Sequence, residues 1–324
     1  MATHTRYAPD RGLTVRMTAT MFLLGLVFVA FVALIIGIMT AAHASGAAII
    51  LVALIFGGGS AFLSLFYSDK IALAAAGARE VSAQEAPDLH GIVDRLCALA
   101  DMDKPRIAIA PARMPNAFAT GRNSKNSVLC VTEGLLYNSG LTKEELEGVL
   151  AHELSHVAHK DVQVMTYASL LAIVAGLLVR FAFYSELFGG GRRGGNDGNA
   201  ALLIPLIMLA SAVVYAISFL LIRLLSRYRE LAADRSGALL TQNPSALISA
   251  LTKVSQGMNR IPTQDLRAAE PMNAFYFAPA MKLGGGASVS AIFSTHPSLD
   301  KRIEQLAKIQ RELGQVDSGP RGLK

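Results

Sequence analysis

Five consecutive residues carry the clearest chemical signal in this chain of 324 residues, and they read His152-Glu153-Leu154-Ser155-His156. The residues before them predict a helix, and helix positions four apart lie on the same face. Two imidazoles one turn apart can bind one zinc ion, and the Glu153 carboxylate can then lie beside a water on that metal. Zinc lowers the pKa of such a water to about 7, so a glutamate can take its proton. The pattern predicts a zinc hydrolase, most simply a peptidase.

A catalytic zinc site has three protein ligands and keeps one position open for water. His159 is the nearest other histidine, but it can hardly reach a metal that residues 152 and 156 already hold. We expect Glu230 to be the third ligand, on a helix over about 223–240. Asp234 lies one turn later, where its carboxylate can accept a hydrogen bond from the outer nitrogen of a ligand histidine. The alternative for Glu230 is an exposed carboxylate that pairs with the arginines around it.

The composition indicates a membrane protein. Hydrophobic residues make up 52% of the chain, charged residues only 17%, and the mean hydropathy is +0.41, whereas soluble domains average about 25% charged residues. The excess lies in apolar runs that are each long enough to cross a hydrocarbon core of about 30 Å. These runs cover about 17–42, 46–66, 162–184 and 200–222. The first is too long for a typical signal-peptide core, so we expect it to be retained as a membrane helix.

Arginines near the ends of these runs predict the orientation. Three arginines precede the first run and four lie within residues 223–235, whereas residues 40–45 contain neither lysine nor arginine. Cytoplasmic loops carry such an excess of positive charge, so we expect the N-terminus, segment 69–161 and segment 223–324 in the cytoplasm. Two runs separate His156 from Glu230, which places both on the same side of the membrane.

The remaining bulk features are less informative. The net charge of +6 is mostly the cytoplasmic bias just described, and no basic stripe interleaved with aromatic residues predicts nucleic-acid binding. Cys97 and Cys130 are the two cysteines. Both fall on the predicted cytoplasmic side, where a reduced, structural role is expected.

The segment before the zinc-binding pattern predicts a small sheet. Apolar residues predict strands over 105–110 and 127–132, and residues 116–120 form either a third extended piece or an ordinary loop. An exposed edge strand can pair with an extended peptide through backbone hydrogen bonds. We therefore expect protein or peptide substrates to bind as an added strand.

Capping patterns predict where the helices of this segment begin. Ser82 and Glu85 have the spacing of a capping box, and Pro87 suits a first helical turn. Thr142 and Glu145 form a second capping box, at the start of the helix that carries the two histidines.

Beyond residue 240 the sequence predicts a long loop and a last helix. Proline and glycine in residues 261–290 favour a mobile loop, and the glycine-rich connection 185–199 favours a flexible one. The last helix carries its apolar residues on one face, namely Leu299, Ile303, Leu306 and Leu313. We expect disorder after Gly314.

Together these features predict a mainly α membrane protein with four transmembrane helices and a cytoplasmic, zincin-like α+β catalytic domain with a small sheet. The catalytic domain is assembled from two halves. The predicted parts are residues 1–68 with the first two spans, 69–161 with the histidine pair, 162–222 with the last two spans, and 223–324 with the third ligand.

The chain resembles the HtpX family of integral-membrane zinc peptidases, relatives of the CAAX prenyl endopeptidases. The resemblance covers most of the chain from about residue 80 onward. It rests on the layout of four spans and on motifs in a specific order, which are Pro115-Asn116-Ala117-Phe118-Ala119, His152-Glu153-Leu154-Ser155-His156, Arg229-Glu230-Leu231-Ala232-Ala233-Asp234, and Thr295-His296-Pro297 leading into Arg302.

This resemblance implies one zinc ion per chain, held by His152, His156 and Glu230, with Glu153 as the general base. It implies endopeptidase action on membrane or misfolded proteins at the cytoplasmic face of a bacterial inner membrane. It also suggests that Asn116 and His296 help to hold the tetrahedral intermediate, because both can donate hydrogen bonds to an oxyanion.

Alternatives remain for the outer residues and for the activity. Asn116 can be a turn residue after a proline, and His296 can be a helix-entry residue before one. Arg302 either pairs with a buried carboxylate or serves an exposed face, and we favour a structural role. The competing functions are a CAAX-type processing peptidase and a non-catalytic zinc-binding membrane scaffold. A structural zinc site would be closed by a fourth ligand such as His159.

Overall fold

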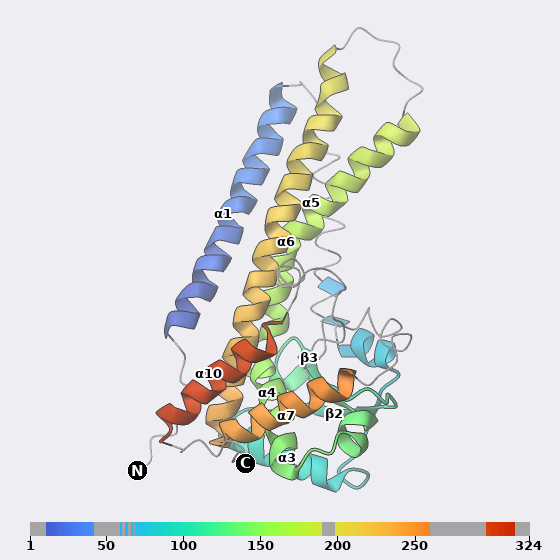
Figure 1. Cartoon of the computed structure of the whole chain (residues 1–324). Coiled ribbons are helices and arrows are strands. Elements are labelled where there is room, and N and C mark those ends of the chain that lie inside the picture. The colour runs from blue at the N-terminus through green and yellow to red at the C-terminus, as the bar shows by residue number, and fades with distance from the viewer. Residues whose placement is uncertain are drawn as a thin grey trace. The chain divides into compact units, whose positions relative to one another are not determined.

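The computed structural model describes residues 11–41, 59, 62–63, 66–67, 69–189, 198–259 and 296–314 (Figure 1). The chain divides into two compact units. One contains Met1–Thr14, Phe66–Val162 and Ser226–Lys324, and the other contains Val15–Leu65 and Gln163–Leu225. Every candidate site residue belongs to the first unit.

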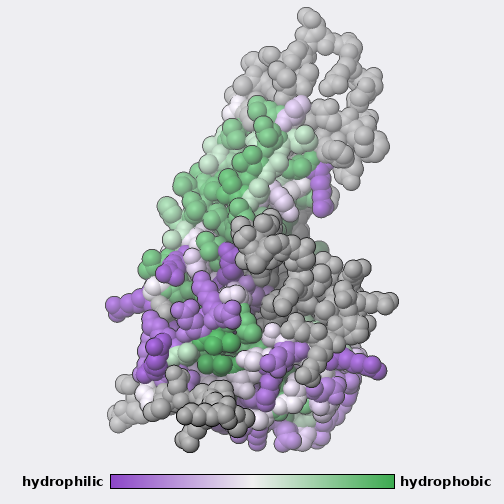
Figure 2. Space-filling model, viewed as in Figure 1, coloured by the Kyte–Doolittle hydropathy of each residue, from purple (hydrophilic) through white to green (hydrophobic). Residues whose placement is uncertain are grey.

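The second unit is formed largely by parts of three long helices, which are α1 (Arg11–Ala41), α5 (Asp161–Gly189) and α6 (Gly198–Thr241). Many of their large apolar side chains are exposed, among them Phe22 and Leu209, and Figure 2 shows apolar residues gathered along these helices. Such exposure would be costly in water but suits a lipid environment. Buried residues from all three helices, such as Phe31, Ala175 and Val214, form a core of their own.

Within the described residues, two helices are long and apolar enough to cross a membrane, Arg11–Ile35 and Pro205–Thr241. A third is counted if Lys143–Ala158 and Asp161–Leu177 form one broken span. The predicted span at 46–66 lies almost wholly outside the described residues. The loop 261–290 and the segment after 314 lie wholly outside them, and so do residues 190–197 of the connection 185–199.

The first unit is built on a four-stranded sheet with the order β1-β2-β4-β3. Its strands are β1 (Arg79–Glu80), β2 (Arg106–Ala110), β3 (Ala117–Gly121) and β4 (Ser127–Thr132). β2 and β4 are parallel, and the other neighbours are antiparallel. The predicted strands are confirmed, and the loop alternative for residues 116–120 is wrong. β3 lies at an edge of the sheet, so one side of its backbone has no neighbouring strand among the described residues.

The helix α4 (Lys143–Ala158) begins as its sequence predicts. The Thr142 hydroxyl accepts a hydrogen bond from the Glu145 backbone N–H, and the Glu145 carboxylate accepts one from the Thr142 N–H. The same carboxylate also contacts Ser249 and Lys253 on α7 (Pro244–Asn259). The start of the helix that carries both histidines is therefore held by its own capping box and by contacts with α7.

The first capping box is different. Glu85 does accept hydrogen bonds from the backbone N–H and the hydroxyl of Ser82, but the helix α3 (Pro87–Ala100) has Ala86 as its N-cap. The prediction that Ser82 caps this helix is wrong, because its bonds to Glu85 close a separate turn. Pro87 is the first residue of the helix, as expected.

The core of the first unit lies between the sheet and four helices, α3, α4, α7 and α10 (Leu299–Glu312). Leu306 and Ile309 bury one face of α10, with Leu299 and Leu313 packed at its border, which confirms the amphipathic helix. The two cysteines are free and buried. Burial raises the pKa of Cys97 to about 11 and that of Cys130 to about 12, as suits unreactive structural thiols.

The predicted helix over 223–240 is the final part of α6, which continues without a break from the apolar run to Thr241. Its apolar stretch ends at Ile222, and charged residues begin at Arg223. Near its end α6 crosses α4 closely, because a Cβ atom at Gly237 would lie 2.9 Å from the backbone nitrogen of His152. The absence of a side chain at Gly237 thus lets the two helices meet at the first histidine.

Candidate metal centre

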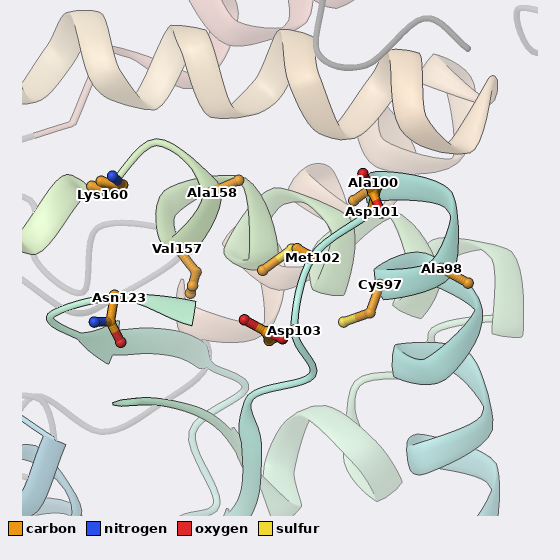
Figure 3. A pocket seen from close by; sticks show the side chains of 10 residues that line it. All are labelled: Cys97, Ala98, Ala100, Asp101, Met102, Asp103, Asn123, Val157, Ala158 and Lys160. Atoms are coloured by element: carbon orange, nitrogen blue, oxygen red, sulfur yellow. The ribbon is translucent and has the colours of Figure 1, made fainter. Parts of the chain in front are cut away.

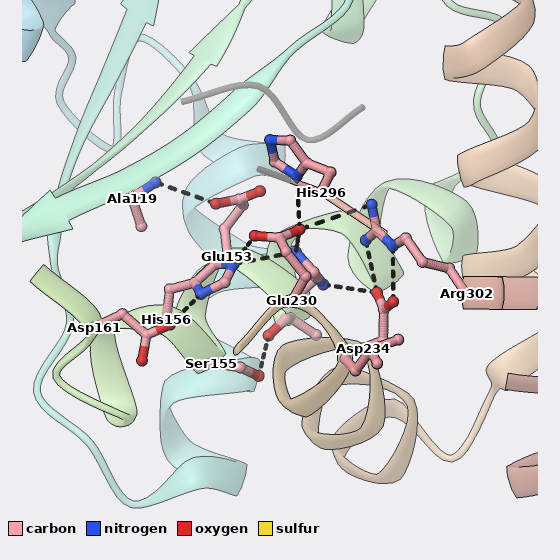
Figure 4. A network of polar contacts seen from close by, with 12 residues as sticks. Ala119, Glu153, Ser155, His156, Asp161, Glu230, Asp234, His296 and Arg302 are labelled. Carbon is pink, nitrogen blue, oxygen red and sulfur yellow. Dashed lines mark hydrogen bonds and ion pairs between the residues drawn. The ribbon is translucent and has the colours of Figure 1, made fainter. Parts of the chain in front are cut away.

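The structure brings His152, His156 and Glu230 together (Figure 4). One ligand atom from each lies within 4.8 Å of the others. The Nε2 atoms of the two imidazoles are 3.2 Å apart, and the Glu230 carboxylate lies 3.7 Å from Nε2 of His152 and 3.5 Å from Nε2 of His156. Two candidate ligands come from α4 and one from α6, so the tertiary fold adds Glu230 to the pair that the helix spacing provides.

The outer nitrogen of each imidazole faces a carboxylate. Nδ1 of His152 lies 2.9 Å from Asp234, the partner expected from the sequence. Nδ1 of His156 lies 2.5 Å from Asp161, a residue not predicted from the sequence to belong to the site. An acid at a histidine's outer nitrogen fixes the tautomer that leaves the inner nitrogen ready to bind a metal. The one sequence signal for Asp161 is a lone acid directly before an apolar run.

Each of these carboxylates is paired with a buried arginine. Arg302, on α10, binds Asp234 through Nε at 2.7 Å and through a terminal nitrogen at 2.6 Å. Arg229, on α6, forms an ion pair with Asp161. Only 2% of Arg302 and 3% of Arg229 is exposed. Of the two alternatives for Arg302, the structure shows the pair with a buried carboxylate.

Glu153 lies beside the ligands and below the edge strand. Its carboxylate accepts a hydrogen bond from the backbone N–H of Ala119 on β3 at 3.2 Å. Burial raises the pKa of Glu153 well above its usual range, and the neighbouring Glu230 raises it further. A carboxyl group with such a pKa is suited to accept and return a proton.

The other residues singled out in the sequence take three different positions. Nδ1 of His296 lies 3.0 Å from the Glu230 carboxylate, and this histidine is buried two residues before Ser298, the N-cap of α10. Asn116 is buried directly before β3, and its backbone N–H donates to the Thr132 hydroxyl. His159 contacts the Ser236 hydroxyl at 3.2 Å and does not belong to the converging group of His152, His156 and Glu230.

The electrostatics of the cluster fit a divalent cation. Burial lowers the pKa of His152 and that of His156 to about 4, so both imidazoles are neutral near pH 7 and can offer a lone pair. Buried carboxylates outnumber buried guanidinium groups by two, with Glu153, Glu230, Asp234 and Asp161 against Arg229 and Arg302. An uncompensated buried charge is costly, and a zinc ion would balance this excess when all four carboxylates are ionised.

A cavity of about 560 Å³ lies near the C-terminal ends of α3 and α4 (Figure 3). Its lining includes Cys97, Met102, Asn123, Val157 and Lys160. None of the converging ligands lines it, although Val157 directly follows His156. The candidate metal centre therefore lies in the buried cluster and not in this cavity.

Comparison with known proteins agrees with the geometry. The model of Peptidase family M48 matches residues 83–310, which contain all the candidate site residues. The chain belongs to peptidase family M48. M48 peptidases are zinc-dependent metallopeptidases, and the resemblance recognised in the sequence is confirmed.

Individual M48 relatives are similar over nearly their whole length. "Protease HtpX homolog 1" of Streptomyces coelicolor is 55% identical, over 96% of this chain and 97% of its own. "Protease HtpX homolog" of Moorella thermoacetica is 48% identical, over 94% and 96%. "Protease HtpX homolog 2" of Methanosarcina mazei is also 48% identical, over 95% and 99%. The chain is thus an M48 metalloprotease of the HtpX group.

A solved structure, "Crystal Structure of S. mikatae Ste24p", is more distant. It shares 16% identity, a TM-score of 0.45, and coverage of 92% of this chain and 66% of its own. This likeness is too weak to inform the site.

Proposed function

We propose that this protein is a zinc-dependent membrane endopeptidase that cleaves membrane or misfolded proteins at the cytoplasmic face of a bacterial inner membrane. His152, His156 and Glu230 hold one zinc ion. The observation that carries the proposal is the convergence of these three ligand atoms within 4.8 Å, two from α4 and one from α6. Membership of the M48 family supports it independently.

The residues around the ligands have separate tasks. When bound, zinc supplies a Lewis acid and lowers the pKa of water. Glu153 takes the proton of the attacking water and delivers it to the leaving amine. The Ala119 N–H holds the Glu153 carboxylate at the edge strand. His296, which lies against Glu230, and Asn116 donate hydrogen bonds to the developing oxyanion.

The edge strand β3 binds the substrate as an added strand. Asn116 accepts a backbone hydrogen bond from Thr132 on β4, and paired residues alternate along an antiparallel strand. The backbone groups of Ala117, Ala119 and Gly121 therefore point away from β4. The bond from the Ala119 N–H to Glu153 agrees with this alternation. A peptide that pairs there passes directly over the candidate base.

Peptides with single N-methyl groups test this pairing. A methyl group at a backbone nitrogen that bonds to β3 removes that hydrogen bond, so cleavage should slow at every second position along the peptide. Cleavage rates and product masses are measured for each peptide. Equal rates at all positions would contradict strand addition.

The membrane arrangement rests on apolar runs and charge. Four spans are proposed, of which the run at 46–66 lies almost wholly outside the described residues. Among the described residues, α1 and α6 each contain a stretch that is long and apolar enough to span. The arginine bias supports a cytoplasmic position for both catalytic halves.

Sealed vesicles test the metal, the activity and the orientation together. Full-length protein is prepared in inside-out and in right-side-out vesicles, and casein is added outside. Inside-out vesicles should cleave casein, a membrane-impermeant chelator should stop the reaction, and added zinc should restore it, because the site faces the outside only in that orientation. Products are identified by mass spectrometry.

The same assay distinguishes the competing functions. Zinc bound without any cleavage of casein indicates a non-catalytic scaffold, and cleavage confined to a prenylated peptide indicates a CAAX-type processing peptidase. Activity only in right-side-out vesicles refutes the proposed orientation. The contact of His159 with Ser236 weakens the scaffold alternative, since His159 is not placed as a fourth ligand in the described structure.

A further inference from the structure

Six residues of α6, from Arg229 to Asp234, contact both candidate histidine ligands and Asp161. Glu230 faces both imidazoles, Asp234 bonds to Nδ1 of His152, and Arg229 pairs with Asp161, which bonds to Nδ1 of His156. The segment from Arg229 to Asp234 therefore provides a ligand and also reaches the outer nitrogen of each histidine, once directly and once through Asp161.

We infer that Asp161 is a positioning residue for the metal ligand His156, and that Arg229 compensates the buried charge of Asp161. This inference rests on the proposed zinc site. Asp161 holds the His156 ring through the contact of 2.5 Å at Nδ1. Arg229 holds the Asp161 carboxylate through its other oxygen. The two residues act on the metal only through His156.

The backbone between α4 and α5 explains how Asp161 reaches this position. On an unbroken helix, a residue five positions after His156 would lie about 140° around the axis from it. Here α4 ends at Ala158, and Lys160 has a φ of 57°, in the left-handed region that lysine rarely adopts. The break turns Asp161, the first residue of α5, back toward His156.

His156 needs this support more than His152 does. The side chain of His152 is 1% exposed, whereas that of His156 is 16% exposed, so less packing restrains the His156 ring. Asp161 alone would be an unpaired buried charge, and Arg229, 3% exposed, compensates it. The pair thus keeps an ionised acceptor in a buried place.

Variants of the full-length protein in detergent test the inference through zinc affinity. Asp161→Ala removes the acceptor for His156, and Asp161→Asn keeps an oxygen acceptor but loses the charge pair with Arg229. Arg235→Met is the control. Arg235 lies on α6, as Arg229 does, but it pairs with Glu312 at 3.5 Å and not with Asp161. Zinc affinity is measured by competition with a chelator, and cobalt(II) absorption reports the coordination geometry.

We expect Asp161→Ala to weaken zinc binding about 10- to 100-fold and to change the cobalt spectrum. Asp161→Asn should recover most of the affinity, since an amide oxygen still accepts from Nδ1–H. Arg235→Met should bind zinc as the parent does. A purely structural ion pair predicts instead that Asp161→Asn binds zinc as poorly as Asp161→Ala, because both variants lose the pair with Arg229.

The result that overturns the inference is equal zinc affinity for the parent and Asp161→Ala, or no recovery in Asp161→Asn. Failure of the parent to bind zinc refutes the proposed function instead, so the two failures are distinguishable. If Asp161→Ala does not fold, Asp161→Leu takes its place, because it fills a similar volume without an acceptor. If Asp161→Leu does not fold either while Asp161→Asn binds as the parent does, the acceptor role stands.

Discussion

Replacing Glu153 by glutamine is expected to leave zinc bound and to lower the rate of casein cleavage about 10²- to 10⁴-fold. The amide has nearly the shape of the carboxylate and can stay beside the Ala119 N–H, 3.2 Å away in the parent. It cannot accept a proton from water. None of the three converging ligands is changed, so zinc content should match the parent.

Glu144→Gln is the control for this substitution. Glu144 lies in the first turn of the same helix and is exposed, so its variant should cleave casein at the parental rate. Both variants are assayed at equal zinc content, and that content is measured by elemental mass spectrometry. Parental turnover in a zinc-loaded Glu153→Gln protein would refute the proposed mechanism.

Replacing Arg302 by methionine is expected to cost about 3–5 kcal/mol of unfolding free energy, because it leaves the buried Asp234 carboxylate without its guanidinium partner. The parent has a guanidinium with two bonds to Asp234, at 2.7 Å and 2.6 Å. Zinc affinity should also fall, since Asp234 holds Nδ1 of His152 at 2.9 Å. The loss of unfolding free energy reports on the fold, and the loss of zinc affinity reports on the metal centre.

Unfolding can be followed with a thiol-reactive dye, because the chain has no tryptophan and both Cys97 and Cys130 are buried. Arg311→Met on the same helix is the control, since Arg311 is exposed and bonds only to a backbone carbonyl at 3.4 Å among the contacts described. It should change stability by less than about 0.5 kcal/mol.

A double substitution separates the two roles of Arg302. Asp234→Leu with Arg302→Met removes both charges, so most of the stability should return. Zinc affinity should remain low, because Asp234→Leu removes the acceptor for Nδ1 of His152. Equal unfolding behaviour of Arg302→Met and Arg311→Met would show that the buried pair contributes nothing to the fold.

The local structure of the site could largely be predicted from the sequence. The spacing of His152 and His156 places two imidazoles on one face, and Thr142 with Glu145 fixes where their helix begins. The apolar pattern gives the strands over 105–110 and 127–132. Such features depend on residues close together in the chain, so their spacing contains the necessary information.

Predictions that needed a contact between distant residues were less complete. We expect Glu230 near the histidines because two apolar runs lie between His156 and Glu230, and Asp234 because it lies one helical turn after Glu230. One local prediction was also wrong, since Ser82 does not cap α3: its bonds to Glu85 close a turn that ends before the helix begins. Arg302 was recognised without its partner, since its pair with Asp234 joins residues 68 positions apart.

Residue type and short spacing in the sequence are enough to predict the helix with its two imidazoles, the candidate base and the apolar runs. The candidate third ligand is predicted from the two apolar runs between it and the histidines. Tertiary packing decided which arginines pair with the carboxylates around the candidate ligands, and it added Asp161 to them. Asp161 reaches His156 only because the helix breaks at Lys160, and Arg302 reaches Asp234 only because α10 packs into the core. Helix periodicity places a residue on a face, but only packing decides what that face meets.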